Sequence, residues 1–105
     1  MKVAIINYGM GNLKSIIGSL NHLGIQDIIV TYDPEEINTC DKIILPGVGA
    51  FKEAMKNIKE LKLDETLRFN VIEKKKPILG ICLGMQLMCT YSEEGGLVKG
   101  LDFVN

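Results

Sequence analysis

The chain has 105 residues, of which 47% are hydrophobic, and it carries a formal net charge of −1. This length predicts one domain spanning residues 1–105 with a modest core, and the near-neutral charge excludes the basic footprint of a nucleic-acid partner. No apolar stretch reaches the ~20 residues that a membrane span needs. The three cysteines, Cys40, Cys82 and Cys89, are odd in number and widely spaced. They form neither a disulfide framework nor a metal knuckle, which predicts a reducing, cytoplasmic setting without metal or cofactor.

Apolar runs bounded by Gly, Pro or Asp predict buried strands. In chain order they cover residues 3–6, 26–32, 41–45 and 77–81, and a further short strand is expected after Gly95-Gly96. Between them, apolar residues recur at helical spacing. The predicted helical faces are Leu13, Ile16, Ile17, Leu20 and Leu23; Phe51, Ala54, Met55, Ile58 and Leu61; Leu63, Leu67 and Val71; and Leu83, Leu87, Met88 and Tyr91. Asp33 before Pro34 predicts an additional N-capped helical turn.

Strands that alternate with helices predict an α/β domain with a doubly wound, mostly parallel sheet and helices on both faces. The pattern stops where a further strand–helix unit should begin, so the predicted fold is incomplete. An uncovered last strand would expose apolar surface, and we expect self-association through this exposed sheet edge.

Cys82 is the candidate nucleophile. It lies in Gly80-Ile81-Cys82-Leu83-Gly84, between a predicted strand and a predicted helix. This is the pattern of a nucleophile elbow with Cys in place of Ser, where glycines on both sides avoid collisions with a strained turn. The start of the helix favours the thiolate, and the Leu83 amide can stabilise an oxyanion. A buried cysteine that packs as a small hydrophobic residue is the alternative.

Two further features fall near the same edge of the predicted sheet. In Leu45-Pro46-Gly47-Val48-Gly49 the glycines leave backbone amides unobstructed, so the loop can complete an oxyanion hole. Gln86 follows Cys82 by one helical turn and can hydrogen-bond an amide substrate. A plain turn and an exposed helical glutamine are the competing interpretations.

Two other candidates are weaker. Gly9 and Gly11 resemble a phosphate-binding turn but lack the third glycine of a dinucleotide fingerprint, so a tight turn near a partner is favoured. A cysteine nucleophile needs a base, and the single histidine, His22, falls near the end of the first predicted helix. It is interpreted as a solvated helix-end residue.

The segments NYGMGNLKSI, ILPGVGAFKEAM and PILGICLGMQLM resemble, in order and spacing, the class I (triad) glutamine amidotransferases, and in particular the glutaminases that serve imidazole glycerol phosphate synthesis. The resemblance covers nearly the whole chain. It implies a flavodoxin-like class I amidotransferase fold and hydrolysis of glutamine through a Cys82 thioester. Amides of Leu83 and Val48 would form the oxyanion hole, while Gly47, Gly49 and Gln86 would bind glutamine.

The resemblance also implies that ammonia passes to a (β/α)₈-barrel cyclase subunit in a heterodimer, with the YGMGN loop near that partner. Members of the family are longer, and the His and Glu of their triad lie in a C-terminal half that has no counterpart in these residues. The chain is therefore expected to be inactive alone. The alternatives are an amidotransferase for bacterial surface sugars, a non-catalytic partner-binding domain with Cys82 as a relic, and a cysteine hydrolase whose His comes from another chain.

Overall fold

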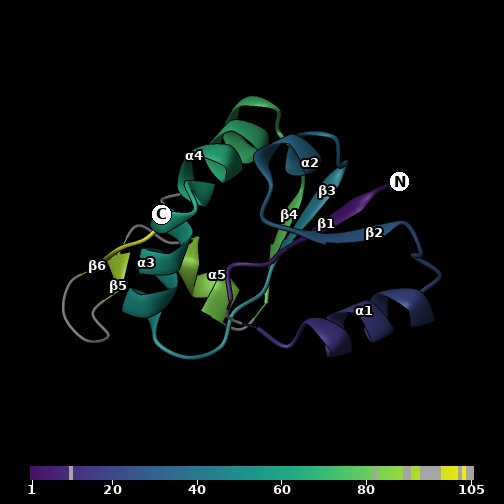
Figure 1. Ribbon diagram of the computed structural model, residues 1–105, viewed down its shortest axis with the longest axis horizontal. Coiled ribbons are helices and arrows are strands. Elements are labelled where there is room, and N and C mark those ends of the chain that lie inside the picture. Colours follow the sequence, from purple (N-terminus) through teal and green to yellow (C-terminus); the bar gives the residue numbers. More distant parts are fainter. Residues whose placement is uncertain (10, 82, 89–90, 93–97, 102, 104–105) are drawn as a thin grey trace.

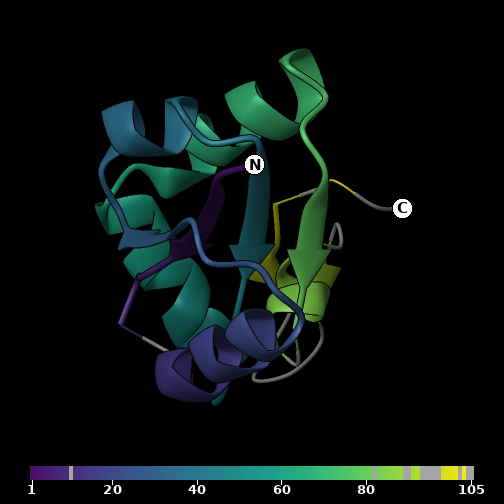
Figure 2. The same ribbon diagram turned by 90° about the vertical axis from the view of Figure 1, so that its right-hand side faces the viewer.

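The computed structural model describes residues 1–9, 11–81, 83–88, 91–92, 98–101 and 103. Four short strands form one all-parallel sheet with the order β2-β1-β3-β4. They are β1 (Val3–Ile6), β2 (Ile28–Thr31), β3 (Lys42–Leu45) and β4 (Ile78–Gly80). This confirms the predicted α/β class and the four apolar strands. β2 and β4 are the two edges of this sheet, and β4 lies at the right-hand edge in Figure 2.

The helices begin and end close to the predicted positions. They are α1 (Leu13–His22), α2 (Pro34–Asn38), α3 (Phe51–Glu60), α4 (Leu63–Arg68), the π-helical turn η1 (Phe69–Glu73) and α5 (Leu83–Leu87). Asn12 caps α1 through a side-chain bond to the Ser15 amide, and Asp33 caps α2 in the same way through the Glu35 amide. Each cap satisfies a backbone donor that the first helical turn leaves free.

Alternation along the strands sends apolar side chains to both faces of the sheet. On one face, Val3, Ile5 and Ile44 pack against the apolar stripe of α1. On the other face, Ala4, Ile6, Ile43 and Leu45 pack against side chains of α2, α3, α4 and α5. Figure 1 shows α1 on one side of the strands and α3 on the other, so the sheet is doubly wound, as predicted.

The end of the chain departs from the prediction. Tyr91 was expected on the helical face that follows Cys82, but α5 ends at Leu87 and Tyr91 belongs to strand β5 (Tyr91–Ser92). β5 pairs antiparallel with β6 (Val98–Lys99) in a separate two-stranded sheet. The edge of the main sheet opposite β2 is therefore β4, and not the strand after Gly95-Gly96.

The segment after β6 returns to the helices. The Leu101 amide donates to the Leu87 carbonyl at 2.7 Å, and the Phe103 amide donates to the Met88 carbonyl at 2.7 Å. Leu101 is buried, and its carbonyl accepts a hydrogen bond from Arg68 of α4 at 2.8 Å. These contacts fix the end of α5 against the rest of the domain.

Candidate functional site

The loops after β3 and β4 lie side by side at the carboxyl edge of the sheet. Leu45 and Gly80 are register partners at the ends of the two parallel strands. The Ile81 amide then donates to the Leu45 carbonyl at 3.0 Å. Because parallel strands end at a common edge, the loop of residues 46–50 and the start of α5 form one site region, as the sequence predicted.

Two glycines allow this close approach. A Cβ on Gly84 would collide with the backbone carbonyl of Leu45, so the first turn of α5 rests directly on the end of β3. A Cβ on Gly47 would meet the Tyr8 hydroxyl, the Gly84 amide nitrogen at 3.0 Å and the Leu83 Cβ at 3.1 Å. Glycine is required at both positions because the neighbouring atoms leave no room for a side chain.

The Leu83 amide, a predicted oxyanion donor, already has a partner. It donates to the Gly47 carbonyl at 3.0 Å. Leu83 itself is buried, and its side chain belongs to the core between the sheet and α3. The Leu83 N–H can reach a ligand only if the Gly47 carbonyl turns away, and we call this hydrogen-bonded arrangement the closed form of the loop.

The second half of the loop, residues 48–50, faces solvent. Val48 is 52% exposed, and Gly49 adopts a φ of 99°, which side chains other than glycine's rarely tolerate. The exposed Val48–Gly49 segment is thus backbone that a ligand or a partner protein can reach. Among the described residues, none accepts a hydrogen bond from the Val48 amide and so fixes its direction.

Cys82 itself lies outside the described residues, between Ile81 and Leu83. Gln86 belongs to α5, and its side chain also lies outside the described part of the chain. The positions of both functional groups therefore stay predictions. What the structure describes is their frame, which consists of the end of β4, the start of α5 and the Gly47 loop.

Tyr8 is a residue of this region that the sequence reasoning did not single out. It is 2% exposed, and its hydroxyl donates to the Pro46 carbonyl at 2.5 Å, which joins the loop after β1 to the loop after β3. Burial raises the pKa of Tyr8 well above its usual range, so the hydroxyl stays protonated. The sequence feature that could have identified Tyr8 is the position of an aromatic residue directly before the Gly9–Gly11 turn.

The remaining candidates lie elsewhere. His22 is exposed in the last turn of α1, as predicted. Leu20 and Ile25, which flank it, line a cavity of about 220 Å³ with Met1 and Pro77 at the opposite, amino edge of the sheet. Cys40 is buried, its Sγ donates to the Glu36 carbonyl at 3.4 Å, and burial raises its thiol pKa. It is therefore a packing residue.

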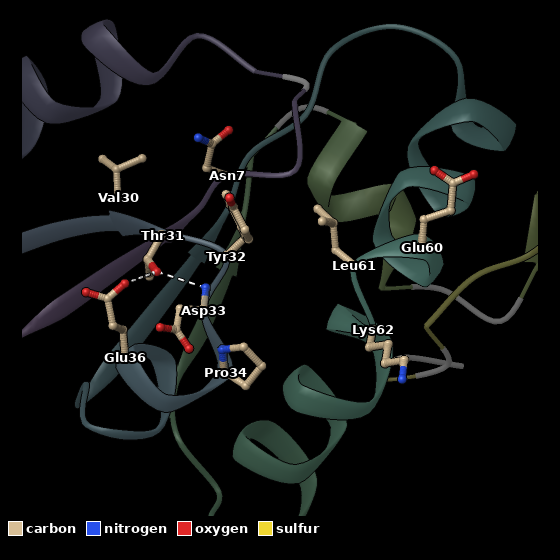
Figure 3. Close-up of a pocket in the computed structure, with 10 residues that line it drawn as sticks. All are labelled: Asn7, Val30, Thr31, Tyr32, Asp33, Pro34, Glu36, Glu60, Leu61 and Lys62. Atoms are coloured by element: carbon tan, nitrogen blue, oxygen red, sulfur yellow. Dashed lines mark hydrogen bonds between the residues drawn. The ribbon is translucent and has the colours of Figure 1, made fainter.

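A cavity of about 670 Å³ opens beside the ends of β1 and β2, and none of the predicted site residues lines it (Figure 3). One wall carries Thr31, Asp33 and Glu36, and the facing wall carries Glu60 and Lys62. Thr31 donates to Glu36 at 2.6 Å and accepts from the Asp33 amide at 2.9 Å, while Asp33 caps α2. These polar groups serve the local structure of the β2–α2 connection.

Two features are absent from the described residues, a membrane-spanning helix and a cluster of metal-ligating side chains. Across the described part of the chain, no helix is both long and apolar enough to cross a membrane. A group of three or more His, Cys, Asp or Glu side chains that could hold a metal ion is also lacking among those residues.

Comparison with known proteins identifies the family. Residues 4–99 match the family model of glutamine amidotransferase class-I. The chain is 50% identical over 104 residues to imidazole glycerol phosphate synthase subunit HisH 2 of Vibrio vulnificus, covering 99% of this chain and 49% of that protein. It is 52% identical over 103 residues to subunit HisH 2 of Methanococcus maripaludis, covering 98% and 50%.

A third relative, subunit HisH of Moorella thermoacetica, is 51% identical over 102 residues, covering 97% of this chain and 48% of that protein. The chain thus spans about half the length of the curated relatives it matches. The parallel sheet, the Gly-lined loop beside the start of α5 and the match over residues 4–99 agree with one another. The chain belongs to the class-I glutamine amidotransferase family.

Proposed function

We propose that this chain carries the nucleophile half of a glutaminase site in a glutaminase subunit of imidazole glycerol phosphate synthase. The observation that supports it most is the packing of the Gly47 loop against Leu83 and Gly84, the two residues that follow Cys82 in the sequence. The names of the relatives, which are about 50% identical to this chain, support the assignment to this synthase.

In the proposed reaction, the Cys82 thiolate attacks the side-chain amide carbon of glutamine. The C–N bond breaks, and the leaving nitrogen takes up the proton that the base removed from the thiol and departs as ammonia, so that a glutamyl thioester remains on Cys82. Water then attacks the thioester, glutamate is released, and the thiol is restored. The net change is glutamine plus water to glutamate plus ammonia, and it needs no metal, redox group or other cofactor.

The developing negative charge on the amide oxygen needs backbone donors. The N–H groups of Leu83 and Val48 are proposed for this role, and Gly47, Gly49 and Gln86 are proposed to hold glutamine. In the closed form the Leu83 N–H is bound to the Gly47 carbonyl. Turnover therefore requires the Gly47–Val48 peptide to turn so that the carbonyl leaves and the Val48 amide approaches.

The base that activates Cys82 is not found in this chain. His22 sits in the last turn of α1, toward the amino edge of the sheet, while the Gly47 loop is at the carboxyl edge. We propose that the base lies in the portion that the relatives have in addition. The 105-residue chain alone is then inactive or nearly so.

The proposed partner is a (β/α)₈-barrel cyclase subunit that receives the ammonia in a cytoplasmic heterodimer. The exposed Val48–Gly49 segment and the turn at Gly9 and Gly11 lie close together, because Gly11 stands against Pro46. A partner that docks on this edge would contact both loops at once.

A second candidate function is a non-catalytic, partner-binding α/β domain. The observation that favours it is the hydrogen bond from the Leu83 amide to the Gly47 carbonyl, which blocks the oxyanion donor in this form. In that case Cys82 would be dispensable for every function of the chain.

One experiment separates the two functions. Glutamate release from glutamine is measured for this chain, for the chain mixed with a barrel synthase, and for the chain supplemented with the remaining half of a relative. The proposal expects no activity without the added half and clear activity with it, abolished by Cys82→Ala. Cys40→Ala is the matched control, because that buried thiol lies outside the site. Absence of Cys82-dependent glutamate in every mixture would support the non-catalytic domain.

A further inference from the structure

Tyr8 is a buried, titratable residue that the proposed chemistry does not use. Its hydroxyl donates to the Pro46 carbonyl at 2.5 Å, and its own backbone carbonyl accepts a hydrogen bond from the Asn57 side chain of α3 at 3.2 Å. Its ring belongs to the core on the α3 side of the sheet. Tyr8 is therefore joined to α3 through its backbone carbonyl and to the loop after β3 through its hydroxyl.

Consecutive carbonyls of the loop after β3 have different partners. The Leu45 carbonyl accepts from the Ile81 amide, and the Gly47 carbonyl accepts from the Leu83 amide, each at 3.0 Å. Between them, the Pro46 carbonyl accepts from Tyr8. The first and third bonds tie the loop to the start of α5, whereas the second ties it to the rigid core.

Resting on the proposed function, we propose that Tyr8 is a positioning residue for the oxyanion loop. Its hydroxyl fixes the orientation of the Pro46–Gly47 peptide. The following Gly47–Val48 peptide can then rotate while the peptide before it stays in place. When no ligand is bound, the Gly47 carbonyl returns to the Leu83 amide. The hydroxyl also stands beside Gly47, where any side chain would collide with it. Tyr8 thus restrains the loop on the Pro46 side of the Gly47–Val48 peptide. On the other side of that peptide, Gly49, with its φ of 99°, brings no side chain that would restrain the loop.

The hydroxyl suits this task because it remains a donor. Burial raises the pKa of Tyr8 above that of an exposed tyrosine, so the group is neutral at neutral pH. A neutral donor to a carbonyl orients the peptide without introducing a charge beside a nucleophilic thiolate. Phenylalanine would fill the same volume and lack this one bond.

The test is amide hydrogen exchange by NMR on the 105-residue chain, comparing Tyr8→Phe with the unmodified protein. Loss of the anchor should speed exchange of the Leu83 amide about five- to tenfold relative to the Ile81 amide, as expected for the loss of one hydrogen bond. Ile81 is the internal reference because its acceptor, Leu45, precedes the anchored peptide. Tyr32→Phe is the matched control, because Tyr32 is 54% exposed at the same edge.

An unchanged Leu83 to Ile81 ratio would overturn the proposal. So would an equal acceleration of all slowly exchanging amides, strand β1 included, because that is the signature of a merely structural loss of stability. If Tyr8→Phe does not fold, the unmodified chain still decides. The Tyr8 hydroxyl proton must appear as a slowly exchanging resonance with a cross-relaxation signal to the Gly47 protons, and its absence contradicts the anchor. These readouts report on the loop alone, so they are independent of whether the chain hydrolyses glutamine.

Discussion

At the scale of single residues, the second glycine of the elbow pattern shows how sequence and packing meet. Gly84 places its α-carbon against the Leu45 carbonyl, where a methyl group has no room. The atom it would meet belongs to the backbone of a central strand, which cannot move as a flexible side chain would. Steric exclusion is therefore the physical reason for this glycine, whatever chemistry occurs at position 82.

Substitution of Gly84 by alanine should lower the free energy of unfolding by about 3 kcal/mol, because the new methyl forces α5 away from β3. Gly18→Ala is the control, since Gly18 is exposed within α1 and a Cβ there meets nothing within 4 Å. That change should stabilise the protein by about 0.5–1 kcal/mol, as removal of a helical glycine usually does. Urea denaturation followed by circular dichroism measures both, and equal effects would refute the steric argument.

At the scale of elements, a buried polar cluster joins η1 to α2 and to the segment before β4. Asn70 of η1 is fully buried and donates at 2.8 Å both to the Asn38 side chain and to the Thr66 carbonyl. The Lys76 ammonium donates to the Asn70 side chain at 2.6 Å and to the Asn38 carbonyl at 2.8 Å. The cluster satisfies both the amide nitrogen and the oxygen of the buried Asn70 side chain, whereas Asn38 itself is exposed.

Asn70→Ala should cost about 2–3 kcal/mol of stability, because it leaves a cavity at a fully buried position and removes the hydrogen bonds to the Thr66 carbonyl and from the partly buried Lys76 ammonium. Asn21→Ala provides the comparison, since Asn21 is exposed on α1 and its loss should change stability by no more than about 0.5 kcal/mol. Thermal unfolding of the two variants under one buffer condition distinguishes them. A similar melting temperature for both would show that the cluster contributes little.

Most of the helices and strands were predictable, because the spacing of apolar residues and the local residue composition indicate them. Apolar runs of three or four residues marked β1 to β3, and the stripe of Leu13, Ile16, Ile17 and Leu20 marked α1. Tyr91 was assigned wrongly because it continues a helical spacing from Leu87, and two-residue strands such as β5 have no period to detect. Pairing with β6 decides its conformation.

The site was predictable only in its outline. Glycine spacing indicated that the Gly47 loop and the start of α5 meet, and the register of β3 with β4 confirms this. The sequence does not indicate in which direction a backbone peptide group points. The hydrogen bond from the Leu83 amide to the Gly47 carbonyl could therefore not be predicted. The same holds for Tyr8, whose contact with Pro46 spans 38 positions and depends on the tertiary fold.

At the scale of the whole molecule, the β4 edge is apolar and uncovered. Leu79 at its centre is 58% exposed. It lines a groove of about 310 Å³ together with Ile16 and Leu20 of α1, with Leu23 directly after that helix and with Ile81. An unpaired edge strand beside apolar side chains favours association with another chain. We therefore keep the proposal that the 105-residue chain self-associates at this edge.

Sedimentation velocity over a hundredfold range of concentration tests this proposal. The unmodified chain should sediment faster as concentration rises, whereas Leu79→Lys should remain a monomer, because a charge at the centre of the edge opposes strand pairing. Val30→Lys is the matched variant on the opposite edge strand, where Val30 is 37% exposed, and it should still associate. A clean monomer for the unmodified chain at every concentration contradicts the proposal.

The placement of α1 has a consequence for how the molecule comes apart. No residue of α1 is fully buried, and among the described elements it is the only helix packed on its face of the sheet. The opposite face is covered by four helices with many fully buried side chains. Detachment of α1 therefore costs less free energy than melting of the sheet. A protease present during brief native-state fluctuations should cut first on either side of α1 and leave the strands and the other helices as a folded remnant.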